Sequence, residues 1–283
     1  MHYKFAMKQS LSAFALFAAG CCFSGAAAAP AKNAHPARTR VYSDAIQTAF
    51  VRKDVAVLTA MAEAGNSEAQ FWLGLMYANG DGVLQDYSSA AKWFYKSANL
   101  GVVSAQYNLG YLYEHGQGVS QNQENAIIWY RKAALQGDID SQLSLGRIYY
   151  LGSGVSRDYD AAIHWFRQAA QQGDAKAQTQ VGTMYEQGEG IAQDYAVASF
   201  WYSKAADQGW PVAQASLGWM YENGRGVPQD YVQAHKWFNL AAVNYSNETD
   251  RSVLTGRRDA VAAKMTRTQI AEAQRLASAW RKK

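Results

Sequence analysis

The sequence predicts an all-α fold, a solenoid of tandem helix-turn-helix repeats with terminal cap helices. Three observations support this class. The chain of 283 residues repeats itself every 36 residues between about residues 65 and 245. Each period contains two amphipathic segments of helical length. Only two of the four prolines, Pro211 and Pro228, follow residue 40, so most of the chain is free to be helical.

The repeat is visible as columns of identical residues. One column is Trp93, Trp129, Trp165, Trp201 and Trp237, each followed by Phe or Tyr. Another column is Gly65, Gly101, Gly137, Gly173 and Gly209. Tryptophan is too rare for five such coincidences. Because one repeat cannot bury both of its apolar stripes alone, neighbouring repeats are expected to stack into a continuous core.

The first helix of the first repeat is predicted over residues 69–79, and its end at Gly80 suits a left-handed C-cap. Gly74 lies inside this helix, where glycine costs about 1 kcal/mol relative to alanine. Glycine recurs at this position in all five repeats. We therefore expect a neighbouring helix to approach closely here, under a large aromatic side chain.

The second helix is predicted to begin at Asp86, since aspartate and asparagine are good N-cap residues. The equivalent positions are Asn122, Asp158, Asp194 and Asp230. Between the helices, Gly80-Asp81-Gly82 could be read as a phosphate-binding loop. Such a loop needs a preceding strand and a third glycine that opens a helix, and neither is present. A turn is the favoured interpretation.

The segments on either side of the repeats are interpreted as caps. Residues 42–64 form a short helical hairpin in which Ala45, Ala49, Val57, Leu58 and Met61 are expected to make the apolar face. After the repeats, residues 246–283 contain helices predicted at 253–263 and 267–280. The last begins with a capping-box pair, Thr266 and Gln269, and carries the apolar stripe Ile270, Ala273, Leu276, Ala277 and Trp280.

Residues 1–29 have the layout of a signal peptide, with early lysines, an apolar middle and small residues before a cleavage site. A transmembrane anchor is the alternative, but the apolar run is shorter than the roughly 20 residues that span a bilayer. A second alternative is a lipid anchor at Cys21, because Ala18 to Cys21 resembles a lipobox. Residues 30–41 are interpreted as a linker, and the mature protein is expected to be periplasmic or secreted.

The repeat also resembles a known family. Its pattern A-Q-x-x-L-G-x-M-Y-x-x-G-x-G-V-x-x-D-Y-x-x-A-x-x-W-Y-x-K-A-A-x-x-G is similar to the Sel-one-like repeat, a relative of the tetratricopeptide repeat. The tail at 265–280 resembles the end cap of bacterial members. This resemblance implies a right-handed superhelix that scaffolds other proteins. Some cysteine-rich secreted members bind penicillins and have been described as weak β-lactamases, but the repeats here contain no cysteine.

No catalytic or metal-binding motif accompanies the repeats, so we predict neither a catalytic residue nor a cofactor. The five histidines are scattered, and His164 and His235 are expected on the helix surface. Residues 44–247 carry 13 Lys and Arg against 19 Asp and Glu, which disfavours nucleic acid as a partner. Residues 248–283 carry nine against four and could contact an anionic lipid or polymer, or be a solvated face.

A partner is expected to bind where the repeats differ, because packing does not dictate those positions. The variable column after the helix glycine, together with the column two before it, lies on one face of the first helices. The family resemblance implies that this face is concave. The candidate protein-binding residues are Trp72, Leu75, Tyr111, Arg147, Thr183 and Trp219. Packing between repeats is the alternative role for these columns, and Trp210 is a further candidate for an exposed aromatic residue.

The sequence therefore predicts a non-enzymatic scaffold or adaptor in the bacterial envelope. Its expected partners are proteins, with the cell-wall and exopolysaccharide machinery as candidates. A penicillin-binding or β-lactamase-like hydrolase of the same repeat fold is the alternative.

Overall fold

The computed structural model describes residues 40–245 and 248–282. The predicted signal peptide, the lipobox at Cys21 and nearly all of the predicted linker lie outside these residues. The described residues are helical and contain no strand. The helical hairpin that we predicted at residues 42–64 starts earlier, because Arg40 and Val41 of the predicted linker belong to its first helix.

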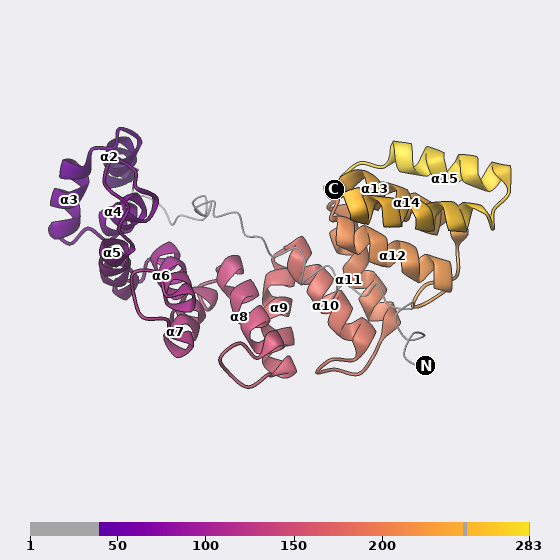
Figure 1. The fold of residues 1–283 in the computed structure, drawn as a ribbon, viewed down its shortest axis with the longest axis horizontal. Helices are drawn as coiled ribbons and strands as arrows, with labels where there is room; N and C mark the ends of the chain where they lie inside the picture. The colour runs from indigo at the N-terminus through magenta and orange to yellow at the C-terminus, as the bar shows by residue number, and fades with distance from the viewer. Residues whose placement is uncertain (1–39, 246–247, 283) are drawn as a thin grey trace, which may run out of the picture. The chain divides into compact units, whose positions relative to one another are not determined.

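Fourteen helices follow one another along the described residues (Figure 1). Their bounds are α2 Arg40–Val51, α3 Val55–Glu63, α4 Ser67–Asn79, α5 Tyr87–Asn99, α6 Val103–His115, α7 Gln123–Ala134, α8 Ile139–Leu151, α9 Tyr159–Gln171, α10 Ala175–Gln187, α11 Tyr195–Asp207, α12 Pro211–Asn223, α13 Tyr231–Asn244, α14 Glu248–Ala262 and α15 Arg267–Ala279. The described residues divide into two compact units after residue 157, one with α2 to α8 and one with α9 to α15. Within each unit neighbouring helices pack in sequence order, from α2 to α8 and from α9 to α14, and α15 packs on α13, which makes the protein an all-α solenoid.

The ends of the repeat helices follow the predicted caps. The first helix of every repeat ends at a left-handed glycine, and Gly80 has φ 76°. The second helix of every repeat is capped by an aspartate or asparagine side chain, and Asp86 accepts from the Ser88 amide. Since these side chains occupy otherwise unpaired amides of the first turn, they define where each helix starts.

The N-cap at Asp194 gives a direct test of this interpretation. Its carboxylate accepts from the amides of Ala196 at 2.9 Å and Val197 at 3.0 Å. Asp194→Ala should therefore lower the free energy of unfolding by about 1 kcal/mol, measured by urea denaturation. Asp194→Asn, which keeps an accepting oxygen, serves as the control. A loss of equal size in both variants would contradict the capping role.

The helix glycines let an aromatic ring lie directly on the first helix, as predicted. A Cβ atom on Gly110 would lie 2.8 Å from Cδ1 of Tyr130, and one on Gly182 would lie 2.8 Å from Cδ1 of Tyr202. The ring belongs to the residue that follows the repeat tryptophan. Tyr130 and Tyr202 are fully buried, so this contact is the centre of the repeat core.

The second glycine of the G-x-G turn has a role that the sequence did not reveal. A Cβ on Gly226 would lie 2.0 Å from the carbonyl oxygen of Tyr195, and one on Gly118 would lie 2.1 Å from the carbonyl carbon of Tyr87. Tyr195 and Tyr87 begin the second helix of the preceding repeat. At these two glycines the turn therefore packs backbone against backbone on that helix, and this contact joins consecutive repeats.

The first hairpin, α2 and α3, packs on α4 but presents different residues from those expected. Ala49 and Leu58 are buried as predicted, whereas Ala45 and Val57 are exposed. Ile46 and Ala62 complete the core instead. The rotation of α2 about its axis explains the difference, because it turns Ile46 and Ala49, which are three residues apart, toward α4.

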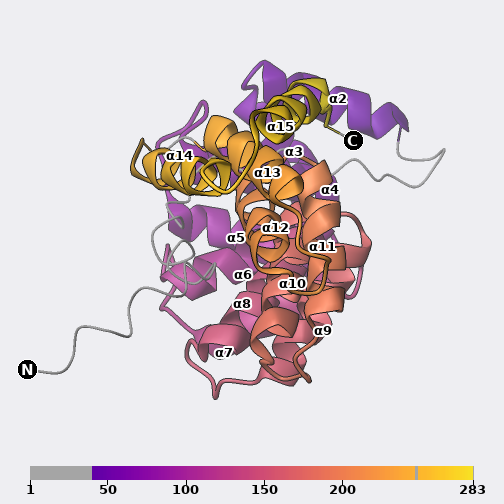
Figure 2. The ribbon, with the colours of Figure 1, turned by 90° about the vertical axis from the view of Figure 1, so that its right-hand side faces the viewer.

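At the other end, α13 carries both terminal helices, α14 and α15 (Figure 2). The capping box of Thr266 and Gln269 is present at the start of α15. His235, which we expected on the surface, is buried with 3% exposure. Burial lowers the pKa of His235 below its usual value, and the charge of Arg258 in α14 adds to this lowering. No helix in residues 40–245 or 248–282 combines the length and apolarity needed to cross a membrane.

Candidate protein-binding surface

The candidate surface lies on the first helices of the repeats, and we call it the first-helix surface. Helices α4, α6 and α8 contribute to it in residues 40–157, and α10 and α12 contribute in residues 158–282.

In residues 40–157 the surface is organised around Glu114 of α6. Its carboxylate forms an ion pair with Arg147 of α8 and accepts from the Tyr130 hydroxyl at 2.8 Å. The side chain of Glu114 is 10% exposed and that of Arg147 is 28% exposed. Burial, followed by the charge of Glu114, holds the pKa of Tyr130 well above its usual value. The guanidinium of Arg147 is therefore fixed by a buried acid while part of it faces solvent.

Tyr111 lies beside this ion pair on the same helix. It is half-buried, and its ring stacks on His115 with 4.0 Å between ring centroids. His115 is exposed, and its Nδ1 lies 2.9 Å from the carbonyl oxygen of Tyr111. The pair offers a preordered aromatic edge to solvent, which is the kind of group that contributes strongly to protein interfaces.

Trp72 was predicted as a binding residue, but its contacts indicate a role in packing between helices. Its ring centroid lies 4.4 Å from that of Phe50 and 5.4 Å from that of Phe71. The indole nitrogen is buried and has no hydrogen-bond partner. Trp72 therefore joins the first hairpin to the first repeat, with only part of its ring exposed.

Leu75 and Thr183 do not belong to the surface, although both were predicted to. Leu75 is 6% exposed and lies in the core with Phe71 and Phe94. Thr183 is 2% exposed, donates to the carbonyl of Thr179 at 3.0 Å and lies 3.1 Å from the Tyr202 hydroxyl. Their column is shared with Tyr111 and Arg147, whose longer side chains reach solvent where these short ones do not.

In residues 158–282 the surface is centred on Trp219 of α12. The Arg225 guanidinium lies 5.1 Å from the Trp219 ring and 5.1 Å from the Tyr195 ring, and it donates to the Tyr195 hydroxyl at 2.6 Å. Trp219 is half-buried, while Arg225 is exposed. These cation–π contacts hold an arginine against two aromatic rings at the surface. Trp210 occupies the N-cap position of α12 without a capping hydrogen bond from its side chain, and it is half-buried, not fully exposed.

Glu186 of α10 lies beneath this arginine. It accepts from the buried Tyr202 hydroxyl at 2.6 Å. Burial raises the pKa of Glu186 above its usual value, while the hydrogen bond from Tyr202 and the charge of Arg225 partly oppose that rise. The charged form of Glu186 is therefore disfavoured in the folded protein relative to the unfolded chain.

This shift predicts a pH dependence of stability. The pKa of Glu186 is higher in the folded protein than in the unfolded chain. Its contribution to the free energy of unfolding is therefore fully present below the unfolded pKa and is lost as the pH rises through the folded pKa. In Glu186→Gln the side chain stays neutral, so the free energy of unfolding should lack the decrease with rising pH that Glu186 causes. The measurement is the free energy of unfolding across the acidic range. Parallel profiles for the two proteins would contradict the prediction.

The structure adds a column of glutamates to the predicted surface. Glu114, Glu186 and Glu222 occupy the same repeat position, three residues after the column of Tyr111, Thr183 and Trp219. Glu222 pairs with Lys264 at 3.1 Å, since its repeat has Phe238 in place of the tyrosine hydroxyl. The column varies among repeats, with Ala78 and Tyr150 at its other positions. The same criterion of variability and spacing could have identified it.

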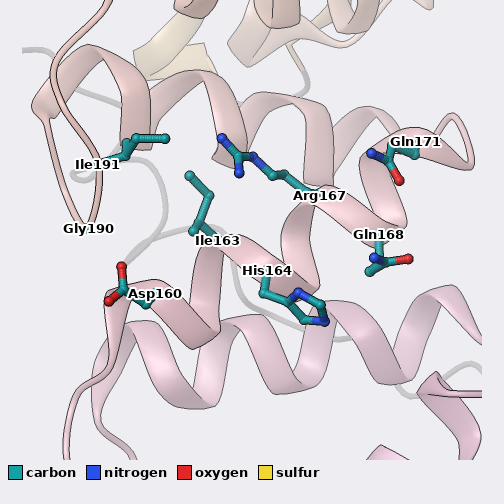
Figure 3. Close-up of a pocket in the computed structure, with 8 residues that line it drawn as sticks. All are labelled: Asp160, Ile163, His164, Arg167, Gln168, Gln171, Gly190 and Ile191. Carbon is teal, nitrogen blue, oxygen red and sulfur yellow. The ribbon is translucent and has the colours of Figure 1, made fainter.

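A separate cavity of about 440 Å³ lies in residues 158–282 between α9 and the turn before α11 (Figure 3). Its lining residues are Asp160, Ile163, His164, Arg167, Gln168, Gln171, Gly190 and Ile191. Arg167 extends toward Ile191, donates to the Tyr185 hydroxyl and lies over the Tyr185 ring. This cavity is open and polar, and it lies on the second helices. It is not part of the first-helix surface.

Within residues 40–245 and 248–282, no group of three or more His, Cys, Asp or Glu side chains is arranged to hold a metal ion. The fold and the surface together define an α-solenoid repeat protein whose variable positions carry aromatic and charged side chains. Residues 67–102, 103–138, 139–174, 175–210 and 211–242 each match the model of the Sel1 repeat. The chain belongs to the Sel1 repeat family.

Solved structures agree with this assignment. A Sel1 repeat protein from Oxalobacter formigenes is 32% identical over 80% of this chain and 96% of that chain, with a TM-score of 0.68. The protective antigen c5321 of uropathogenic Escherichia coli is 32% identical over 80% of this chain and 55% of that chain, with a TM-score of 0.51. No curated protein of described function matches the sequence. Proteins of this family are generally non-enzymatic interaction scaffolds.

Proposed function

We propose that this protein is a non-enzymatic scaffold of the bacterial envelope that binds a protein partner through its first-helix surface. The observation that carries the proposal is the pair of ordered clusters at the variable repeat positions. Tyr111 and Arg147 lie in one, and Trp219 and Arg225 lie in the other. Tyr, Trp and Arg dominate binding energy at interfaces, and they are most effective when held in place before the partner arrives.

The proposed location rests on the leader-like residues 1–29, and the proposed partners are components of cell-wall or exopolysaccharide machinery. Export would bring the solenoid to such partners. Mass spectrometry of the mature N-terminus in cell fractions tests the location and distinguishes removal of the signal peptide from lipidation at Cys21.

The binding surface is tested by recovery of partners from an envelope extract. Tyr111→Ala/Trp219→Ala changes one residue in each unit, and affinity for the recovered protein should fall at least about tenfold. Leu84→Ala/Val243→Ala is the matched control, because both side chains are exposed and neither contributes to the first-helix surface. Arg225→Ala provides a second variant at an exposed position.

Circular dichroism and the urea midpoint establish that each variant is folded. Undiminished recovery of every partner by Tyr111→Ala/Trp219→Ala and by Arg225→Ala would rule out the first-helix surface. Turnover of nitrocefin by the wild-type protein would instead support a hydrolase.

A further inference from the structure

A second surface is formed by the outward faces of the second helices, on which basic residues are concentrated. The outward positions are those one before, and two, three and six after, the repeat tryptophan. Between residues 44 and 247 they contain seven of the 13 Lys and Arg but one of the 19 Asp and Glu. Charge is therefore segregated within a region that is acidic as a whole.

The segregation is clearest on α5 and α7, within residues 40–157. Positions i, i+3, i+4 and i+7 of these helices form one exposed stripe on each. We call these two stripes the basic face, and its residues are Lys92, Tyr95, Lys96, Asn99, Ile128, Arg131, Lys132 and Leu135. The two stripes adjoin, because the Tyr95 ring packs edge-on against Trp129 with 5.9 Å between centroids.

Apolar and basic side chains alternate on this face. Leu135 is 74% exposed, Tyr95 is 51% exposed and Ile128 is 50% exposed. The ammonium of Lys96 lies 4.1 Å from the Trp93 ring and that of Lys132 lies 4.0 Å from the Trp129 ring. Each lysine is thus held beside an aromatic ring, on the same face as the exposed apolar side chains.

The cations of this face are available for a partner. Among the described residues, no carboxylate forms an ion pair with Lys92, Lys96, Arg131 or Lys132. Arg131 donates to the Tyr149 hydroxyl at 3.2 Å, which leaves its charge unneutralised. The basic C-terminal helices differ, because Arg251, Arg258 and Arg275 each pair with an acid of their own helix.

We propose that the basic face binds the surface of an anionic lipid bilayer. Lysine and arginine are attracted to anionic headgroups, while the aromatic and aliphatic side chains enter the boundary between headgroups and acyl chains. The alternation of charge and exposed apolar side chains favours lipid over an acidic polymer, which would give Leu135 and Ile128 nothing to bury against. This proposal concerns a different surface from the one assigned to the protein partner.

The test is sedimentation of the full chain with vesicles of phosphatidylglycerol and phosphatidylcholine in equal parts, compared with pure phosphatidylcholine. The wild-type protein should bind only the anionic vesicles, and less strongly at high salt. Lys96→Gln/Lys132→Gln should weaken partitioning about 30-fold, since each lysine near such a surface contributes about fivefold. Arg267→Gln/Lys282→Gln removes two exposed cations elsewhere and should change it by less than about twofold.

Two further variants separate charge from apolar contact and from folding. Leu135→Ser should weaken partitioning by about tenfold, whereas Leu84→Ser, at a residue 91% exposed in a turn, should leave it unchanged. Lys96→Arg/Lys132→Arg keeps the charge and should retain binding. The proposal is overturned if the wild-type protein ignores anionic vesicles or binds neutral ones equally, or if the folded Lys96→Gln/Lys132→Gln protein binds like wild type.

The proposal is also overturned if the basic face captures a protein and the chain does not bind vesicles. The partner of this face would then be an acidic protein. The test of lipid binding by the basic face is independent of the test of protein binding by the first-helix surface. The Lys96→Gln/Lys132→Gln variant should still recover the protein partner from extract, and Tyr111→Ala/Trp219→Ala should still bind vesicles.

Discussion

Gly226→Ala should lower the free energy of unfolding by about 3 to 5 kcal/mol. Gly226 has φ +69°, where an alanine side chain costs about 1 to 2 kcal/mol. In addition, the new Cβ would lie 2.0 Å from the Tyr195 carbonyl oxygen and 2.2 Å from the carbonyl carbon. Because the obstacle is backbone at the start of a helix and not a movable side chain, the turn and α11 must separate.

The matched control for Gly226 is Gly173, a glycine with φ +97° and no atom within 4 Å of a Cβ. Gly173→Ala carries the conformational cost without the clash and should lose only about 1 to 2 kcal/mol. Urea denaturation of both variants isolates the clash as their difference. Equal losses in the two proteins would show that the backbone contact between turn and helix contributes nothing to the joining of repeats.

The contact at Gly226 shows what the repeat pattern could and could not predict. Local chemistry predicted the caps, because the left-handed Gly80 and the N-cap Asp86 act on residues a few positions away. The second turn glycine acts on a residue about 30 positions earlier. A single repeat gives no sign of that contact, and a packing constraint was inferred from the sequence only for the glycine inside the first helix.

Only part of the candidate surface was predicted correctly, because the repeat pattern does not show how far each side chain extends. Variation among repeats identified Tyr111, Arg147 and Trp219, which reach solvent, but it also selected Leu75 and Thr183, which are buried. The position of a residue in the repeat determines the direction of its Cα–Cβ bond. The length of the side chain then determines whether its end reaches solvent. His235 departs from expectation for another reason, because α14, which has no counterpart in the repeats, packs on α13.

Phe238→Ala should lower the free energy of unfolding by about 3 to 5 kcal/mol, because it empties the centre of a repeat core. Phe238 is 1% exposed and packs with Ala234, Leu254 and Val261. Its ring also lies over Gly218, where a Cβ would approach Cδ1 to 2.9 Å. Gly218→Ala alone should therefore cost about 1 to 3 kcal/mol, since the ring has little room to move.

The two changes should compensate each other. In the Phe238→Ala background the added methyl group enters the vacated space, and alanine favours helix over glycine by about 1 kcal/mol. Gly218→Ala should then be neutral or stabilising by up to about 1 kcal/mol, which gives a coupling of about 1 to 4 kcal/mol in a double-mutant cycle. Gly256→Ala in α14, where no atom lies within 4 Å, is the control and should stabilise both backgrounds by about 1 kcal/mol. If Gly218→Ala costs the same with and without the Phe238 ring, glycine is not required for this close packing.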